Sequence, residues 1–558
     1  MGIRTSVRAY RAVWIAGWLL AAAAAATTRA MAAPSAAPPP AAERVGPVSF
    51  AVSCAPKVSR DFNRGVALLH DFWYEESSRQ FAAIVQSDPT CAMAHWGLAM
   101  SRWHPIWDRP DADAWATGWR EMQAAQAHPA KTARERDYIA ALSNFFRPGP
   151  EDFSARVTAY ETAMGNLYAR YPEDVDAAAF YALSLLASVA PTDTSLTHER
   201  KAMSILTPLW KAHPDHPGLV HYIIHACDTP ALAHDGLAAA RHYGEVAPAV
   251  PHAVHMPAHI FARLGMWQDD IEVNIASIAA SDAAEARGAS GWMDQFHADD
   301  FLIYAYLQSG QEGQARATVA AAQAAMSQRE SMPGMHTEHY MTGMFPYYRT
   351  KLPLFVALET RDWKTVAALQ PVADASPETQ SMTYWARLIA AGHLRDVQQA
   401  RADLAAYDGL MAEVRKGRHA YFADSTGGQI ARGELSGWVA FAAGDLPEAL
   451  QKLRAAADLQ DKVGQVEVDL PAREMLADIL LESGKPREAL AEYQQSMKVS
   501  PNRFNALFNA GKAAEAAGDP GAARGYYVAL LKSTDNGAHS TRVAEIEHAK
   551  AFVATASR

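Results

Sequence analysis

A recurrence at 34 residues places the strongest constraint on how this chain can fold. Near the C-terminus, Gly484 and Tyr493 return 34 residues later as Gly518 and Tyr527. Such a period is typical of chains that stack copies of a helix–turn–helix unit, because each unit buries its apolar face only against its neighbours. The glycine ends the first helix of each unit, and a second apolar helix follows. The sequence therefore predicts an all-α chain with almost no strand.

Other segments fit the same unit. Gly65, Phe81 and Pro89 occupy the small-residue, aromatic and closing-proline positions of a first hairpin, while Gly265 and Gly310 mark turns in the middle of the chain. These features resemble the tetratricopeptide repeat family over most of the chain. The resemblance implies a helical-repeat solenoid, a right-handed superhelix of antiparallel helix pairs. It also implies a concave groove, which in many members binds a peptide or protein.

A narrower resemblance concerns two segments. The run from His221 to Trp267 and the segment Cys91–Gly97 are similar to a group of exported bacterial repeat proteins with a histidine-rich pair of repeats. That group is largely uncharacterised. The similarity therefore implies a fold and an exported location, and it says little about chemistry.

The N-terminus has the three parts of a secretory signal. Three arginines open the chain, an apolar run follows at 12–26, and residues 30–32 offer a small-residue cleavage site. A membrane anchor is the alternative, but an apolar run of about 15 residues is shorter than the roughly 20 that span a bilayer. We therefore expect a signal peptide at 1–32, a flexible Pro/Ala-rich lead-in at 33–50, and a periplasmic or secreted protein.

The rest of the chain divides into two sets of repeats. We expect N-terminal helical repeats with a histidine-rich groove at 51–330, a connector at 331–350 and C-terminal repeats at 351–558. The formal net charge is −10, and it becomes −14 when the four arginines of the signal peptide are removed. This charge argues against nucleic acid as a partner and favours the attraction of cations. No stretch after the signal peptide is long and apolar enough to form a stable membrane span.

The chain has three cysteines. An exported chain meets oxidising conditions, and Cys54 and Cys91 flank the first hairpin, so these two are candidates for a disulfide. Cys227 would then stay reduced. It is either a soft metal ligand next to His225 or a buried apolar residue.

Two pairs of histidines repeat at the same 34-residue period. His221 and His225 lie four residues apart, and His255 and His259 follow them 34 residues later. Residues four apart lie on one face of a helix. Neighbouring repeats would therefore present the same imidazole pair on the same side of the molecule, which predicts a site.

Alignment on the turn glycines extends this site to three neighbouring helices. With Gly265 at its turn, a helix at 251–264 points three histidines into the groove, and the units before and after it add further polar groups. The polar residues placed in the groove are His221, His225, Asp228, His252, His255, His259, His297, Asp300 and Tyr304.

Imidazole and carboxylate groups that converge in this way are typical ligands of transition metal ions. The four paired histidines could share one ion or hold two ions about 3.5–4 Å apart, and the sequence does not decide between these. We predict His225, His255 and His259 as the core ligands. The full set of predicted ligands is His221, His225, His252, His255, His259, His297 and Asp300. Zinc and copper are the expected metals, with iron and nickel as further options. Asp228, Asp300 and Tyr304 are candidates for an acid, a base or a group that orients a ligand.

The sequence leaves two alternatives open. Pro257 lies inside the predicted helix, where it removes a hydrogen bond, so the helix could instead begin near Met256 and leave His252 and His255 in a loop. For the site as a whole, the alternative is a metal-independent scaffold of the cell envelope whose groove binds a peptide or protein. Whether a metal site would be catalytic, structural or a carrier is not decided by the sequence.

Two weaker clusters complete the candidates. One is an aromatic group that we interpret mainly as core or groove wall, formed by His95, Trp96, Trp103, His104 and Trp107. The other is the pair His336 and His339 in the Met/Gly-rich connector, which would form a lid over the groove or an ordinary loop.

Overall fold

The computed structural model describes residues 43–555, apart from 107–108, 129, 333–342, 418 and 466–468. The expected signal peptide lies outside the described residues, as do most of the lead-in, Trp107, His336 and His339. Every regular element within the described part of the chain is a helix. None of the helices described combines the length and apolar character that a membrane crossing requires. The predicted all-α class is confirmed.

The helices before the histidine-rich repeats are η2 (Pro56–Val58), α1 (Ser59–His70), α2 (Tyr74–Ser87), α3 (Ala92–Met100), α4 (Ala112–Ala127), α5 (Ala133–Phe146), α6 (Phe153–Arg170), α7 (Val175–Ala187) and α8 (Thr197–Ala212). The histidine-rich repeats comprise α9 (Pro217–Cys227), α10 (Ala233–Val246), α11 (Pro251–His255), α12 (Pro257–Leu264), α13 (Trp267–Ala286), α14 (Trp292–Gln308) and α15 (Glu312–Glu330).

The C-terminal helices are α16 (Phe345–Glu359), α17 (Trp363–Ala367), α18 (Pro377–Leu394), α19 (Val397–Val414), α20 (Ala420–Ala423), α21 (Thr426–Ala442), α22 (Leu446–Val463), α23 (Ala472–Glu482), α24 (Pro486–Val499), α25 (Phe504–Ala516), α26 (Pro520–Ser533), η4 (Asp535–Gly537) and α27 (Val543–Thr555).

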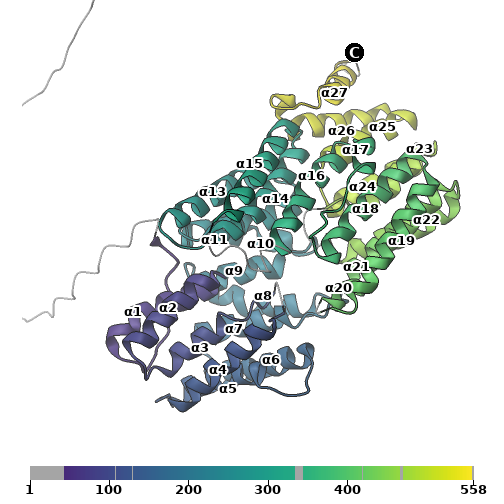
Figure 1. Ribbon diagram of the computed structural model, residues 1–558. Helices are drawn as coiled ribbons and strands as arrows, with labels where there is room; N and C mark the ends of the chain where they lie inside the picture. Colours follow the sequence, from purple (N-terminus) through teal and green to yellow (C-terminus); the bar gives the residue numbers. More distant parts are fainter. Residues whose placement is uncertain are drawn as a thin grey trace, which may run out of the picture. The chain divides into compact units, whose positions relative to one another are not determined.

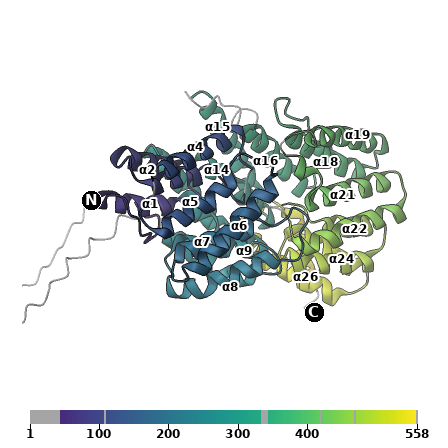
Figure 2. The ribbon, with the colours of Figure 1, turned by 90° about the horizontal axis from the view of Figure 1, so that it is seen from below.

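Consecutive helices pack as pairs, and each pair packs on the next (Figure 1). α9 pairs with α10, α14 with α15, α21 with α22, and α23 with α24. In Figure 2 the second helices of the C-terminal pairs, α19, α22, α24 and α26, follow one another in sequence order. The chain is therefore a helical-repeat solenoid of the tetratricopeptide type.

The 34-residue period is visible in the helix starts. Pro486 begins α24 and Pro520 begins α26, while Pro217 and Pro251 begin α9 and α11. Proline suits the first position of a helix, because its missing N–H would have no partner there and its φ angle is already helical. The same 34-residue spacing of helix starts therefore occurs in both sets of repeats. In the C-terminal pairs α23–α24 and α25–α26 the proline begins the second helix, whereas Pro217 begins the first helix of the pair α9 and α10.

The predicted helix at 251–264 is broken in two. α11 ends at His255, and α12 begins at Pro257, so the proline occupies the first position of a new helix rather than an interior position. Met256 between them keeps helical backbone angles. The expectation of one continuous helix was wrong, and so was the alternative with a loop, because His252 and His255 both lie on α11.

The bonded and free cysteines are the ones that the sequence suggested. Cys54 and Cys91 form a disulfide, and Cys227 is a buried free thiol. The Cys227 sulfur lies 3.5 Å from the sulfur of Met203. Cys227 is therefore a packing residue of α9, and it is not among the side chains that gather as potential metal ligands.

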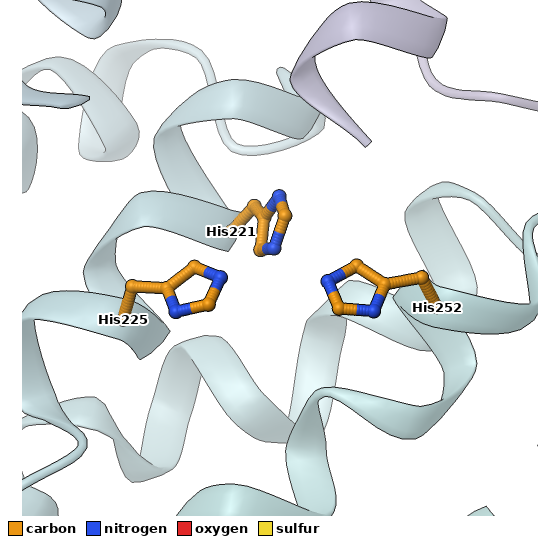
Figure 3. Close-up of side chains that lie close together, drawn as sticks. All are labelled: His221, His225 and His252. Carbon is orange, nitrogen blue, oxygen red and sulfur yellow. The ribbon is translucent and has the colours of Figure 1, made fainter. Parts of the chain in front are cut away.

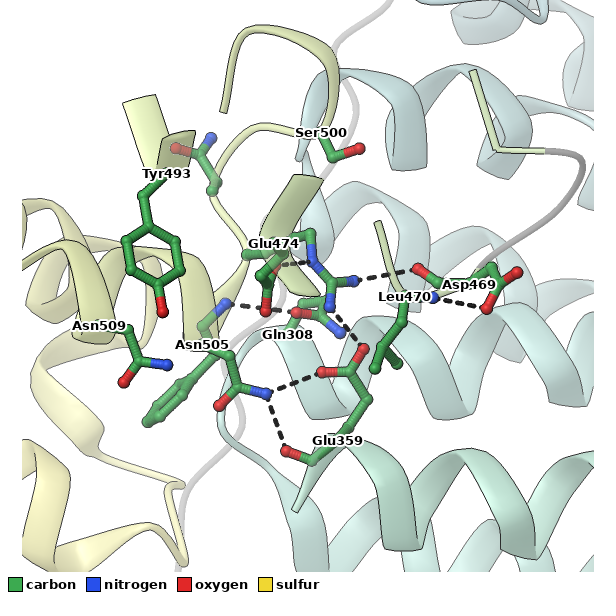
Figure 4. A network of polar contacts seen from close by, with 12 residues as sticks. Gln308, Glu359, Asp469, Leu470, Glu474, Tyr493, Ser500, Asn505 and Asn509 are labelled. Carbon is green, nitrogen blue, oxygen red and sulfur yellow. Dashed lines mark hydrogen bonds and ion pairs between the residues drawn. The ribbon is translucent and has the colours of Figure 1, made fainter. Parts of the chain in front are cut away.

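A buried arginine links three of the C-terminal helices. Arg503, which is fully buried, donates from Nε to Glu474 at 2.8 Å and from Nη2 to Glu359 at 2.7 Å. Asn505 donates to the other oxygen of Glu359 at 3.0 Å. Figure 4 shows Glu359 and Glu474 converging from different helices on this point. The network holds α16, α23 and α25 together.

Removal of this arginine should destabilise the fold strongly. Arg503→Met leaves Glu359 and Glu474 buried without their cation, and breaking a buried pair in this way costs about 3–5 kcal/mol. The free energy of unfolding in urea measures the effect. Arg316→Ala, which removes an exposed i,i+4 pair with Glu312, is the matched control and should cost about 1 kcal/mol or less. Equal, small effects of both variants would contradict the role of Arg503.

Candidate metal centre

Six histidines form two triads in the middle of the chain. The first contains His221, His225 and His252, which point toward one another from α9 and α11 (Figure 3). The second contains His255, His259 and His297, from α11, α12 and α14. Within each triad, one ring nitrogen of every histidine lies within 4.8 Å of the others.

The triads are two copies of one arrangement. Each takes a pair spaced four residues apart from one repeat and a single histidine from the start of the next repeat. His252 is the second residue of α11, and His297 lies in the second turn of α14. The 34-residue period therefore generates a pair of sites.

The two triads are neighbours. Ring centroids lie 4.7 Å apart for His221 and His225, and 4.5 Å apart for His255 and His297. Between the triads, the distance is 6.3 Å from His252 to His255 and 6.5 Å from His225 to His259. The six histidines thus form two adjacent groups of three. This arrangement favours the two-ion alternative that the sequence left open.

Three of the imidazoles are oriented by acceptors on neighbouring helices. His221 donates from Nδ1 to the backbone oxygen of His70 at 2.6 Å, and His259 donates from Nδ1 to a carboxylate oxygen of Asp228 at 2.8 Å. Because these acceptors carry no proton, Nδ1 must hold the hydrogen in both rings. Nε2 then presents its lone pair.

His255 is oriented in the same way through an amide. Its Nδ1 lies 2.7 Å from Oδ1 of Asn274, whose amide nitrogen donates to the backbone oxygen of Asp270 at 2.9 Å. The amide group is therefore turned so that its oxygen accepts from the imidazole. Metal-bound histidines are typically held by such an outer partner on the second ring nitrogen.

The Nε2 atoms are the most informative atoms of the site. Those of His221, His225, His255 and His259 are buried and have no hydrogen-bond partner among the described residues. A buried polar atom without a partner is costly, and most such atoms in native proteins are satisfied. Four lone pairs of this kind in one place fit the donor set of a transition metal ion.

Burial keeps the imidazoles of His221, His225 and His255 neutral, which is the form that binds metal. Burial and the neighbouring His225 hold the pKa of His221 well below its usual value, and burial with His297 does the same for His255. For His225, burial and the nearby His259 lower the pKa to about 3. Protons therefore compete weakly for these rings near neutral pH.

The two predicted carboxylates differ in their contacts. Asp228 accepts from His259, as expected for a group that orients a ligand, and also accepts from Nε of Arg263 at 2.9 Å. Asp300 forms a buried ion pair with Lys351 and belongs to neither triad. Its role as a ligand stays a prediction.

Tyr304 does not reach the histidines with its hydroxyl group. The hydroxyl contacts the guanidinium of Arg503. Burial raises the pKa of Tyr304 above its usual value, so the phenol stays protonated. Tyr304 is accordingly a member of the buried arginine network, and the structure gives it no acid or base role at the triads.

Sequence reasoning missed the outer partners of the histidines. Asn274 and the carbonyl group of His70 come from helices with no histidine pair, and Asp294 lies 3.7 Å from Nδ1 of His252. No pattern in the sequence marks an asparagine or a backbone oxygen as such a partner. Only the packing of α1 and α13 against the histidine helices identifies them.

Three of the six histidines are buried, and the other three are half-buried. His221, His252 and His255 are at most 2% exposed. A small cavity of about 20 Å³, which accommodates roughly one water molecule, lies beside the second triad and is lined by His259, Phe301 and Tyr304 among others. His221, His252 and His255 are therefore enclosed, whereas for the three half-buried rings a position in the groove stays a prediction.

The aromatic cluster near the N-terminus belongs to the core. Trp96 and Trp103 are at most 1% exposed, and His95 pairs with Glu121 at 2.8 Å. His104 stacks on Tyr74 at 4.4 Å. The interpretation as core is confirmed for the two described tryptophans.

Comparisons with known proteins give only distant likenesses. No protein-family model matches the chain, and no curated protein matches it in sequence. The human IFIT1 dimer with PPP-AAAA is 9% identical, with a TM-score of 0.36 over 79% of this chain and 90% of the other. The APC/C hetero-tetramer Cut9–Hcn1 is 11% identical, with a TM-score of 0.32 over 90% and 97%. The TPR domain of P58(IPK) is 12% identical, with a TM-score of 0.20 over 90% and 99%.

These scores are too low to support an argument, so the solenoid fold follows from the paired helices of this chain alone. The narrower similarity to exported bacterial repeat proteins stays a prediction.

The neutral imidazoles predict how the stability of metal-free protein depends on pH. The pKa of His225 is about 3 in the folded chain, against an ordinary value of 6.5. Between these values the unfolded chain binds the proton and the folded chain does not, so the free energy of unfolding falls as the pH drops from about 6.5 toward 3. His225→Gln should weaken this dependence. Urea unfolding of chelator-treated parent and variant across this range makes the comparison, and identical pH slopes would contradict the assignment.

Proposed function

We propose that this protein binds two transition metal ions, one in each histidine triad. The observation that carries the proposal is the set of four buried Nε2 atoms without a hydrogen-bond partner among the described residues. Three imidazoles can hold Zn²⁺ with nitrogen–metal distances of about 2.0–2.1 Å and leave a fourth position open. Imidazole ligands also suit copper, iron and nickel. Zinc and copper remain the preferred metals.

The ligands would be His221, His225 and His252 for one ion, and His255, His259 and His297 for the other. A bound ion would supply Lewis acidity, or electron transfer in the case of copper. The chain's own groups would orient the rings through the His70 carbonyl group, Asn274 and Asp228. The small cavity beside His259 supports access of a water-sized molecule to the second site.

A metal-independent scaffold is the second candidate, since helix pairs of this type can present a groove for a peptide or protein. Burial of His221, His252 and His255 disfavours this use of the triads, because these three rings are at most 2% exposed. A peptide-binding surface elsewhere on the repeats stays compatible with a metal site. The two proposals are separated by metal content.

Metal titration of single variants tests the two-ion proposal. We expect untagged, chelator-treated protein to bind two Zn²⁺ or Cu²⁺ ions at the triads. His225→Ala should remove one ion and His255→Ala the other. A second change within a triad, such as His221→Ala added to His225→Ala, should cost much less than the first, because the site is already broken. The control is His242→Ala, which removes a partly exposed ring paired with Asp215.

Two results would overturn the proposal. One is a parent protein that binds neither metal. The other is a set of triad variants that bind as much metal as the parent, since then the ions are held elsewhere. A parent with one ion that is lost in both His225→Ala and His255→Ala would favour a single site across the two triads.

We further propose that the protein is exported and acts in the periplasm or outside the cell. The Cys54–Cys91 disulfide supports this location, because disulfides persist in oxidising compartments. N-terminal sequencing of protein from the native cell is the test. A mature chain that begins near Ala33 is expected, whereas an intact Met1 in the cytoplasmic fraction would contradict export.

A further inference from the structure

A third cluster of metal-ligating side chains lies apart from the two triads. It contains His70 at the end of α1, Asp176 in the first turn of α7 and His216 immediately before α9. All three side chains are buried. Nothing in the sequence pattern singled them out, because they come from three segments that are more than 30 residues apart.

The geometry of this cluster matches the spacing of ligands around one ion. Nε2 of His70 lies 3.0 Å from Oδ1 of Asp176, and Nε2 of His216 lies 3.3 Å from the same oxygen. Ligand atoms bound at about 2.0–2.2 Å to a four- or six-coordinate metal are separated by about 3–3.5 Å. Two imidazoles and one carboxylate are also a recurring ligand set of catalytic zinc and of non-haem iron.

The ring of His70 is held as metal ligands usually are. Nδ1 of His70 lies 2.9 Å from the hydroxyl group of Tyr222, which provides an outer partner. Close packing fixes the same ring from the side, since a Cβ atom at Gly218 would lie 2.4 Å from Nδ1 of His70. His216 has no such outer partner, since its Nδ1 is buried without a hydrogen-bond partner in the described part of the chain.

The protonation states also suit a cation. Burial lowers the pKa of His70 to about 4. Burial opposes ionisation of Asp176, but hydrogen bonds from His216 and His70 outweigh it and hold the pKa of this carboxyl below its usual range. Near neutral pH the cluster therefore contains a neutral imidazole beside a carboxylate. Metal binding at this point requires each Nε2 to give up the hydrogen that it shares with Asp176, so that the hydrogen of each ring lies on Nδ1.

One side of the cluster is open to a cavity. Asp176 and His216 line a surface cavity of about 750 Å³, whose wall also includes Glu173, Asp174 and Asp215. The one arginine in the wall, Arg134, is ion-paired with Asp174. An acidic entrance attracts cations, and the cavity leaves room for water or a substrate at an open coordination position.

We infer that His70, Asp176 and His216 bind a divalent transition metal ion at the floor of this cavity, separately from the histidine triads. The alternative is a carboxylate that accepts two N–H hydrogen bonds and has only a structural role. The inference does not depend on the proposed function, because no triad residue contributes a side chain. His70 does contact both sites, because its side chain belongs to this cluster and its backbone oxygen accepts a hydrogen bond from Nδ1 of His221.

The experiment therefore changes Asp176 and leaves His70 intact. Metal-free protein with both triads disabled, His225→Ala with His255→Ala, is titrated with Co²⁺ alone and followed by visible absorption and metal analysis. We expect about one Co²⁺ per chain. Adding Asp176→Asn should weaken this binding by more than about 100-fold, because loss of an outer partner alone already costs roughly 10–100-fold. The matched control adds His198→Gln, which removes a ring near the carboxylates of Asp193 and Glu161, and should leave binding unchanged.

The inference is overturned if the folded triad-disabled protein binds no Co²⁺, or if Asp176→Asn binds as tightly as the control. Circular dichroism establishes whether each variant is folded. Should the triad-disabled protein not fold, the same two changes are made in the parent. There Asp176→Asn must lower the Co²⁺ stoichiometry by one and His198→Gln must not, and equal stoichiometries refute the site. Failure of the two-triad proposal would appear instead as triad variants that bind as many ions as the parent.

Discussion

Neutral imidazoles confined in the protein interior are the constraint on which the rest of this site depends. An imidazole lone pair taken out of water must find a donor or a cation. In each anchored ring the Nδ1–H already has its acceptor, which is the His70 carbonyl group, Asn274 or Asp228. The requirement therefore falls on Nε2. Because at least two such Nε2 atoms lie in each triad, one metal ion per triad satisfies them together.

The repeat architecture explains why there are two such groups. Each triad takes an i,i+4 pair from one repeat and one histidine from the next, so the stacking of repeats brings the third ligand to the first two. The break at Pro257 lets His255 and His259 lie on separate short helices while both still belong to the second triad. α13 is longer than α10, the corresponding helix of the preceding repeat. His297, the third histidine of the second triad, therefore follows His252 by more than 34 residues.

The fold could be predicted from the sequence because it is repetitive. The glycine and tyrosine marks of the C-terminal repeats fix the helix pairs, and all six histidines were named from the same alignment. Their division into triads could not be predicted, because a one-dimensional pattern places residues on a helix face and does not say which neighbouring helix completes the site. Asp300 is the clearest example of what the pattern does not predict. Its spacing suits a ligand, yet its carboxylate pairs with Lys351, which lies on a helix about 50 residues away in sequence.

The most direct test of the central claim is anomalous diffraction from crystals of the protein loaded with Zn²⁺ or Cu²⁺, recorded at the absorption edge of the metal. Two peaks are predicted among the six histidines, each within about 2.0–2.1 Å of three ring nitrogens of one triad. In His221, His255 and His259 these nitrogens should be Nε2, since Nδ1 is already used. Metal-loaded crystals with no anomalous peak at either triad would contradict the account.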